Sequence, residues 1–266
     1  MAVEKITSLK NEGIREVISL RDRKARELNR LTVIDGIKEI EAALGAGVKF
    51  RTLYICAELI ERRSASWFLA RFSKLNVEIL ETSRPVFEKI AFGERMEGMV
   101  AVAHQPRLRL NDLKLRANAL LVLVEGVEKP GNLGAILRTC DAAGVDGLIV
   151  CEGRTDVYNP NVIRASLGAV FTVPVVTCSN QEALDFCKAN KVQILGTFPD
   201  AAVSYAKNDY ARSTAFVLGS EQEGLSSFWS RNADVKVSIP MTGQVNSLNV
   251  STTAAVILYE AVRQRK

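Results

Sequence analysis

Three polar segments in the second half of the chain could form a binding site, because each follows an apolar run and carries glycine. The first is EGVEKPGNLGAILRTCDAAG, in which Gly131 and Gly134 flank Asn132. A glycine-bearing loop that opens a helix lets the backbone approach an anion closely. Arg138 follows Asn132 by six residues, so we expect it on the first or second turn of that helix. Its guanidinium either extends to solvent or binds a phosphate.

The second segment is VLGSEQEGLS, in which Gly219 and Gly224 enclose Glu221 and Glu223. Glycines permit tight turns beside a ligand, and carboxylates at a strand end accept hydrogen bonds. The alternative is an ordinary strand-to-helix turn with an acidic helix start. Taken alone, this segment fits that alternative better.

The third segment is SIPMTGQVNSLNVSTTAA, in which Ser247, Asn249 and Ser251 begin an otherwise apolar helix. Serine and asparagine at a helix start are first of all N-caps, which favours a capping role for Asn246 or Ser247. A single N-cap does not explain why Asn249 and Ser251 are polar as well. Ligands of open α/β sheets bind outside the carboxyl ends of the strands, and we expect the three segments there.

The composition excludes several other kinds of site. The chain has no GxGxxG fingerprint and no GK[ST] motif, which excludes the usual dinucleotide and P-loop signatures. Its single histidine, His104, cannot build a multi-histidine metal site, and at the end of GMVAVAHQ we expect a structural role for it. Five scattered cysteines without a CxxC pair exclude a zinc ribbon and a disulfide framework. We therefore expect no metal.

The chain has 266 residues, of which 47% are hydrophobic, enough for one large or two modest globular domains. No window approaches the roughly 18 uncharged apolar residues of a membrane span. The start, MAVEKITSLKNEG, has no apolar signal region. Together with the unpaired cysteines, these features predict a cytoplasmic protein with no membrane association.

From residue 119 onward, short apolar runs alternate with helical patterns. The runs are rich in Val, Ile and Leu, as in parallel strands covered on both faces; they are ALLVLVEGV, GLIVCE, FTVPVVT, VQILGTF, AFVLGS and VKVSIPM. The expected helices are NLGAILRTCDAAG, NVIRASLGAV, NQEALDFCKAN, SSFWSRN and NSLNVSTTAAVILYEAVRQRK. The fold class is therefore α/β, with a doubly wound parallel sheet.

Residues 1–105 predict a smaller α/β module. Its expected strands are FRTLYIC, VEILETS and GMVAVAHQ, and its expected helices are VIDGIKEIEAALGAG, SASWFLARFSKL and PVFEKIAF. The segment IREVISLRDRKARELNR is helical or partly irregular. Residues 106–118 begin with proline and lack an apolar period, so we interpret them as a linker.

The charge is unevenly distributed along the chain. Residues 1–116 contain 22 Lys and Arg against 16 Asp and Glu, whereas the remainder has a net charge of −1. This asymmetry indicates a basic module joined to a neutral one, and it favours a polyanionic partner for the first. A solvated, lysine-rich surface is the alternative.

Together and in this order, the three polar segments resemble the motifs of the SpoU-type (TrmH-like) RNA ribose 2′-O-methyltransferases of the SPOUT superfamily. Motif one contains Asn132 and Arg138, motif two, LGSEQEGLS, contains Glu221, and motif three, IPMTGQVNSLNVSTTAA, contains Ser247 and Asn249.

The resemblance extends over most of the chain. Residues 119–266 are similar to the methyltransferase domain. Residues 1–105 resemble, more loosely, the L30e-like substrate-binding domain that precedes it in many members. The resemblance implies a deep trefoil knot at the carboxyl end of the sheet, where members bind S-adenosylmethionine. The residues that it places around this cofactor are Thr197, Leu218, Gly219, Ile239, Met241, Ser247 and Leu248.

The resemblance also assigns catalytic roles. It gives Arg138 the central one, often described as a general base, but a pKa above about 12 leaves very little neutral guanidine at pH 7. We therefore favour Arg138 as an electrostatic stabiliser of the developing alkoxide and an adjacent phosphate. Asn132 would position that phosphate or the arginine, and Glu221 would orient Arg138 or a loop. Ser247 and Asn249 would shape the substrate side.

The family implies two partners, RNA and a second copy of the chain. Members are homodimers that pack partly through the C-terminal helix and share residues between sites. We expect at least two or three of six basic residues to contact RNA phosphates, with a solvated helix face as the alternative; they are Arg15, Arg21, Arg23, Lys24, Arg26 and Arg30. The N-terminal module resembles that of rRNA-directed members, which favours 23S rRNA as substrate.

Three alternatives remain open at this point. One is a tRNA 2′-O-methyltransferase. Another is a non-catalytic RNA-binding assembly factor on the same fold, although Arg138 and the Ser-Leu-Asn sequence are both intact. The third is a protein that binds the cofactor as a sensor.

Overall fold

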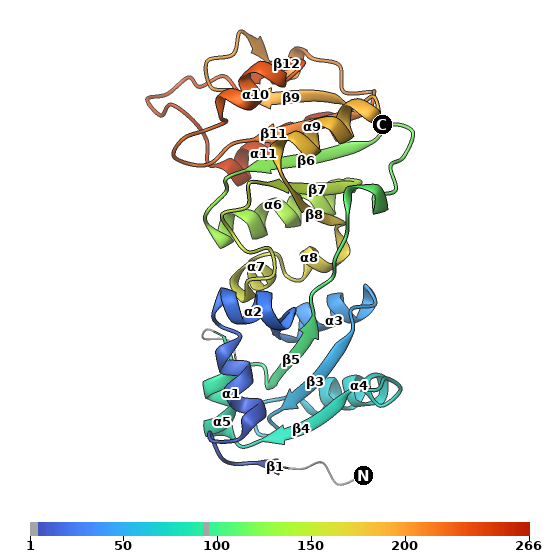
Figure 1. Ribbon diagram of the computed structural model, residues 1–266, viewed down its shortest axis with the longest axis vertical. Helices are drawn as coiled ribbons and strands as arrows, with labels where there is room; N and C mark the ends of the chain where they lie inside the picture. The colour runs from blue at the N-terminus through green and yellow to red at the C-terminus, as the bar shows by residue number, and fades with distance from the viewer. Residues whose placement is uncertain (1–4, 93–95) are drawn as a thin grey trace. The chain divides into compact units, whose positions relative to one another are not determined.

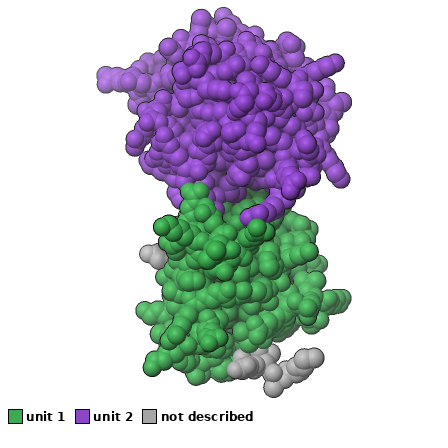
Figure 2. Space-filling model, viewed as in Figure 1, with its two compact units in different colours: residues 1–106, 158–171 green, residues 107–157, 172–266 purple. Residues whose placement is uncertain are grey.

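The computed structural model describes residues 5–92 and 96–266, and its contacts divide the chain into two compact units. Unit 1 comprises Met1–Pro106 and Tyr158–Phe171, and unit 2 comprises Arg107–Val157 and Thr172–Lys266 (Figure 2). Residues 158–171, which the sequence analysis placed in the second domain, therefore pack with the first.

Unit 1 contains a mixed five-stranded sheet in the order β1-β4-β3-β5-β2 (Figure 1). Its strands are β1 (Lys5–Ile6), β2 (Leu31–Asp35), β3 (Phe50–Ile55), β4 (Glu78–Thr82) and β5 (Met99–His104). β4 pairs in parallel with β1 and β3, whereas β5 is antiparallel to β3 and β2. β2 was not expected from the sequence. We expected a helix from Val33 onward, but Gly36, with φ 118°, delays the start of that helix to Ile37.

The helices of unit 1 include two that the sequence left undivided. They are α1 (Glu12–Ser19), α2 (Arg23–Asn29), α3 (Ile37–Gly45), α4 (Arg62–Phe72), α5 (Arg84–Ile90), α7 (Pro160–Ala165) and α8 (Ala169–Thr172), which ends at the unit boundary. Asp22 separates α1 from α2, because its side chain accepts hydrogen bonds from the backbone N–H groups of Lys24 and Ala25. The expected helix NVIRASLGAV is broken into α7 and α8 at Leu167 and Gly168, which both have positive φ.

A buried carboxylate attaches α7 to β2 within unit 1. Oδ2 of Asp35 accepts hydrogen bonds from the Phe92 N–H (2.7 Å) and from Nη1 of Arg164 (3.2 Å). The Thr32 hydroxyl donates to the Tyr158 carbonyl (2.7 Å). Oδ1 of Asp35 is buried and has no hydrogen-bond partner in the described part of the chain. Burial raises the pKa of Asp35 to about 6, with Glu39 and Glu97 adding to the rise and the Phe92 N–H and Arg164 opposing it.

Unit 2 contains a parallel seven-stranded sheet in the order β10-β12-β9-β11-β6-β7-β8 (Figure 1). Its strands are β6 (Leu120–Glu125), β7 (Gly147–Cys151), β8 (Val175–Cys178), β9 (Gln193–Thr197), β10 (Val203–Ser204), β11 (Thr214–Leu218) and β12 (Val235–Ser238). All strand pairs in it are parallel. The expected α/β class with a parallel sheet is confirmed. The trefoil knot stays a prediction.

Helices cover both faces of this sheet. They are α6 (Pro130–Ala143), α9 (Asn180–Ala189), α10 (Ser227–Asn232) and α11 (Val250–Gln264). Buried side chains of α9 and α10 form one core cluster with alternate residues of β6, Leu121 and Leu123. α6 and α11 pack against each other over the opposite face.

The expected linker is not a free connection. Residues 110–112 form a short 3-10 helix, and Leu108 makes a parallel bridge to Val176 of β8. Leu110, Leu113 and Leu115 pack against the core cluster of unit 2. The segment therefore extends the edge of the second unit.

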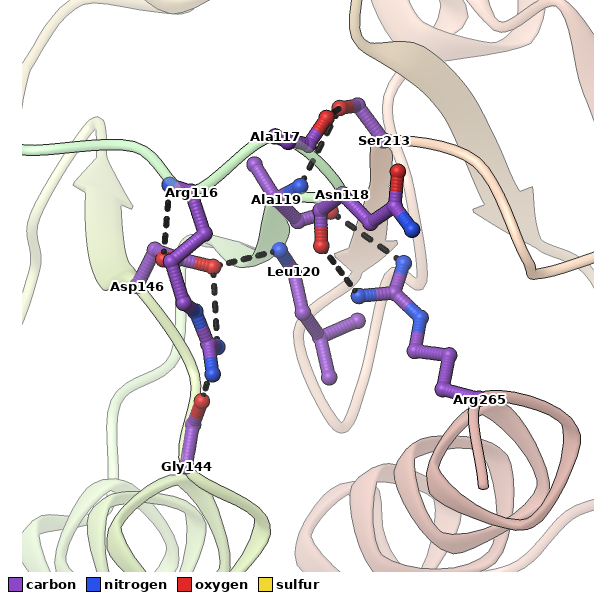
Figure 3. A network of polar contacts seen from close by, with 9 residues as sticks. All are labelled: Arg116, Ala117, Asn118, Ala119, Leu120, Gly144, Asp146, Ser213 and Arg265. Atoms are coloured by element: carbon purple, nitrogen blue, oxygen red, sulfur yellow. Dashed lines mark hydrogen bonds and ion pairs between the residues drawn. The ribbon is translucent and has the colours of Figure 1, made fainter.

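Arg265, the C-cap of α11, fixes the end of this helix to the segments before two central strands, and Figure 3 draws its bonds to Asn118 and Ala119 before β6. The Arg265 guanidinium donates to the carbonyls of Asn118 (2.7 Å), Ala119 (3.2 Å), Tyr210 (2.8 Å) and Arg212 (2.8 Å). The 15 residues of α11 span roughly 22 Å, and the six of β6 span roughly 20 Å. Because the two lengths match, the first turn of α11 reaches the carboxyl ends of the strands.

No helix in the described ranges combines the length and the apolar character needed to cross a bilayer.

We expect the raised pKa of Asp35 to appear in the pH dependence of stability. A carboxyl group whose pKa is higher in the folded state binds more protons in that state than in the unfolded state. Its contribution to the free energy of unfolding is therefore full below the unfolded pKa of 3.8 and is lost as the pH rises through the folded pKa of about 6. The free energy of unfolding should therefore rise on acidification by up to about 3 kcal/mol relative to Asp35→Asn. Urea unfolding of both proteins between pH 4.5 and 7.5 measures this difference, and parallel profiles would contradict the raised pKa.

Candidate active site

A cavity of about 370 Å³ opens at the carboxyl ends of β9, β11 and β12. Its volume lies within the range of small-molecule sites. Its lining includes all seven residues that we expected around a cofactor: Thr197, Leu218, Gly219, Ile239, Met241, Ser247 and Leu248. The structure thus brings these residues together, from segments that lie up to 51 positions apart.

Gly219 shapes this cavity by allowing two backbone segments to touch. A Cβ atom at this position would lie 2.1 Å from the carbonyl carbon of Gly224 and 2.3 Å from the Leu225 nitrogen. The backbones of Ser220 and Gly224 exchange two hydrogen bonds of 3.1 Å, and Gly224 has φ 68°. The loop is therefore closed tightly at its base, which directs its acidic tip toward the cavity.

One chain of hydrogen bonds joins the three polar segments. Nδ2 of Asn132 donates to Oε1 of Glu221, which lines the cavity. Oδ1 of Asn132 accepts from Nδ2 of Asn249 (3.1 Å). Residues separated by 89 and 117 positions thus meet at one amide.

The capping roles in the third segment differ from those we expected. Asn249, not Asn246 or Ser247, is the N-cap of α11, and its Oδ1 accepts from the N–H (2.9 Å) and hydroxyl (2.7 Å) of Ser251. Ser247 lies before the helix and lines the cavity. Asn249 therefore caps α11 with its oxygen and holds Asn132 with its nitrogen.

Arg138 is not part of the cavity wall. It is exposed, and within the described residues its side chain makes no hydrogen bond or ion pair. α6 begins at Pro130, so Arg138 lies on its third turn rather than its first or second, and Gly131 and Gly134 are inside the helix. Six residues of helix rotate Arg138 about 120° away from Asn132 and move it about 9 Å along the axis.

Among the basic residues proposed to bind RNA, Arg26 has a structural role. It is 1% exposed, and its Nη1 donates to the carbonyls of Leu20 and Arg21, both at 2.7 Å. Arg21 donates to the carbonyls of Lys89 (2.7 Å) and Ala91 (3.0 Å). Arg26 therefore stabilises the turn between α1 and α2 and is not exposed to a ligand. The expectation that at least two or three of the six residues contact RNA stays a prediction and rests on the others.

The other four basic residues of the set are exposed. Arg23 pairs with Glu27 one turn later on α2 (2.7 Å). Arg15, Lys24 and Arg30 lie on α1, on α2 and at the C-cap of α2, where Arg30 has φ 56°.

Sequence reasoning missed two residues near the site. Arg154 bridges Glu128, just before α6, to Glu223 (3.0 Å) in the second segment. Nothing in the surrounding GRTD sequence indicates this role, and exposed pairs of this kind contribute little to stability. Glu125, an acid at the end of a buried strand, was a visible signal that we did not use. In the described residues no group of three His, Cys, Asp or Glu side chains is placed to hold a metal.

Comparisons with known proteins identify the family of this chain. The family model of the SpoU rRNA methylases matches residues 119–259, and that of the MRM3-like substrate-binding domain matches residues 11–101. The chain belongs to the SpoU rRNA methylase family. The family that we suspected from the three motifs is confirmed, together with a substrate-binding domain upstream.

Relatives match over most of the chain. A 23S rRNA guanosine 2′-O-methyltransferase of Bordetella pertussis is 36% identical over 88% of this chain and 98% of its own length. A 23S rRNA uridine 2′-O-methyltransferase of Streptomyces viridochromogenes is 33% identical over 88% and 83%. The structure of an AdoMet-bound rRNA methyltransferase from Sinorhizobium meliloti aligns with a TM-score of 0.90, at 29% identity over 98% of both chains.

We expect Gly219→Ala to destabilise unit 2, because the added methyl group would overlap the backbone of Gly224 and Leu225. Overpacking of this kind costs about 1–3 kcal/mol, measurable by urea unfolding. Gly243→Ala is the matched control, since no atom lies within 4 Å of its added carbon. Equal stability of the two variants would refute the proposed tight contact.

Proposed function

We propose that this chain transfers a methyl group from S-adenosylmethionine to a ribose 2′-hydroxyl of 23S rRNA. The observation that carries the proposal is the meeting of Asn132, Glu221 and Asn249 beside a cavity lined by the expected cofactor residues. Relatives named as 23S rRNA 2′-O-methyltransferases match over 88% of the chain or more.

The cavity fits S-adenosylmethionine in size and chemistry. Leu218, Ile239 and Leu248 offer apolar contacts for an adenine ring, and Gly219 lets backbone groups approach it. Related structures from Sinorhizobium meliloti and Streptomyces viridochromogenes contain AdoMet, at 29% and 30% identity. When bound, the cofactor supplies an activated methyl group on a sulfonium.

The residues of the chain then have to orient the acceptor hydroxyl and stabilise its developing charge. The second N–H of the Asn132 amide is free of the Glu221 bond and can donate to an RNA phosphate. The Arg138 guanidinium stabilises the alkoxide and the adjacent phosphate. Glu221 and Asn249 position Asn132, and Ser247 shapes the cavity wall on the substrate side.

We propose that two copies of the chain form a homodimer through α11. Tyr259 of α11 is 51% exposed, and α11 packs on α6, which carries Arg138. Because Arg138 lies outside the cavity wall of its own chain, a second copy would complete the surroundings of its guanidinium.

Ribosomal RNA is a better candidate substrate than tRNA. A tRNA-modifying TrmH/SpoU enzyme of Aquifex aeolicus covers only 57% of this chain, with a TM-score of 0.51. We propose that residues 1–105 bind the RNA, that residues 119–266 catalyse the transfer and that 106–118 connect them. All five cysteines are free, which supports work in the reducing cytoplasm.

We expect Arg138→Ala to reduce kcat for methyl transfer to 23S rRNA by at least about 100-fold, because it removes the cation that stabilises the alkoxide. The affinity for S-adenosylmethionine should stay within about twofold, since Arg138 does not line the cavity. Tritium transfer and calorimetry measure the two quantities. Lys188→Ala is the exposed control, and light scattering of the same samples reports the dimer. Wild-type turnover by Arg138→Ala would refute its catalytic role.

We expect the triple variant Arg15→Gln, Lys24→Gln, Arg30→Asn to weaken RNA binding and to reduce its salt dependence by about 0.7–0.9 per lost phosphate contact. Asn suits the left-handed backbone at position 30. The matched control is Lys188→Gln, Lys191→Asn, Lys207→Gln, which removes equal charge from unit 2 and includes another left-handed position. If both triples bind RNA with the same salt slope, α1 and α2 lie outside the interface.

A further inference from the structure

Glu125 is a buried carboxylate directly behind the cavity loop. It is the last residue of β6 and is 8% exposed. Val124 pairs with Leu218 on the neighbouring strand, so Glu125 and Gly219 are the next residues along the two strands. Because side chains alternate along a strand, Glu125 shares the face of Leu121 and Leu123, which α9 and α10 cover.

Neutral donors surround this carboxylate. Oε1 of Glu125 accepts from Nδ2 of Asn180 (2.6 Å) and from the Ser226 hydroxyl (2.7 Å), and Oε2 accepts from the Ser226 N–H (2.8 Å). Oδ1 of Asn180 in turn accepts from Nε1 of Trp229 (2.9 Å). None of the ion pairs between described residues includes Glu125. These donors satisfy the hydrogen-bonding capacity of the buried carboxyl group and fix its orientation.

These bonds act on the cavity through one peptide link. Ser226 directly follows Leu225, which lines the cavity and whose nitrogen touches Gly219. The loop 219–225 is thus closed at its base by Gly219 and held one residue further on by Glu125. A displacement of Ser226 would move Leu225, open the contact with Gly219 and shift Glu221 away from Asn132.

We propose that Glu125 is a positioning residue of the cofactor site, which sets the place of the loop 219–225 through Ser226. The identity of the ligand rests on the proposed function, whereas the effect on the loop does not. Glu125 is not among the residues that line the cavity, and none of its hydrogen bonds goes to Asn132, so its influence is transmitted through the backbone.

The direction of the hydrogen bond between Glu125 and Asn180 can be reversed by substitution, which provides a test. In Glu125→Gln, an N–H group of the introduced amide faces the donors of Asn180 and Ser226. In Asn180→Asp, the introduced carboxylate faces the carboxylate of Glu125. In the double variant the bond between the two positions is reversed. The introduced glutamine amide then donates to the introduced aspartate carboxylate and to the Ser226 oxygen, and the glutamine carbonyl accepts from the Ser226 N–H. Trp229 keeps its acceptor.

We expect each single variant to weaken S-adenosylmethionine binding by about tenfold or more, and the double variant to return within about threefold of wild type. Calorimetry measures the affinity, and kinetics should show a raised KM for the cofactor with the KM for RNA changed less than about twofold. Urea unfolding of the same proteins separates these effects from general destabilisation. Glu182→Gln, which makes the same change at the exposed capping box of α9 with Ser179 and keeps an acceptor there, is the matched control.

Hydrogen exchange of the peptide 218–226 supplies a readout without any ligand. It should accelerate in both single variants and slow again in the double variant. Failure of the wild type to bind S-adenosylmethionine would refute the proposed function, while this exchange pattern would still support the role of Glu125. Unchanged exchange in Glu125→Gln, or a double variant no better than the singles, would overturn that role.

Discussion

The side-chain amide of Asn132 is the contact on which the arrangement of the site depends. An amide donates and accepts at once, so it can hold the acidic tip of one loop through Nδ2 and the cap of α11 through Oδ1. An aspartate there would repel Glu221, and a serine would be too short to reach both partners. The three segments therefore meet because one side chain carries a hydrogen-bond donor and an acceptor a fixed distance apart.

The parallel sheet brings these partners within reach. Strands that run in the same direction release their loops at one edge, so segments after β6, β11 and β12 emerge as neighbours. α11 returns to the same edge because Arg265 fixes its last turn at the opposite one (Figure 3). The distance from Arg265 to Asn249 is set by helix rise alone, and it matches the length of the central strands.

Much of the site could be predicted from the sequence, because local motifs and strand ends are read directly from residue order. The seven expected lining residues form one cavity, and motif residues from three segments touch. Contacts that depend on tertiary packing were not accessible in this way. Arg26 has the same sequence character as Lys24, yet only the turn between α1 and α2 shows that it is buried. The strand β2 was missed because its pattern continues into α3 without a break other than Gly36.

The arginine side chains of this protein differ in whether another group of the described chain already binds their guanidinium. Arg116, Arg164 and Arg265 each donate to carboxylates or carbonyls, and such bonds fix segments against each other. Arg138, exposed on α6, has no such bond within the described residues. A guanidinium already satisfied by a carboxylate gains little from an incoming phosphate, because the existing bond must first be broken. The Arg138 guanidinium is unpaired among the described residues, and the first turn of its helix, α6, is fixed through Asn132. It is therefore available to bind the negative charge that develops only when RNA is bound and the hydroxyl loses its proton.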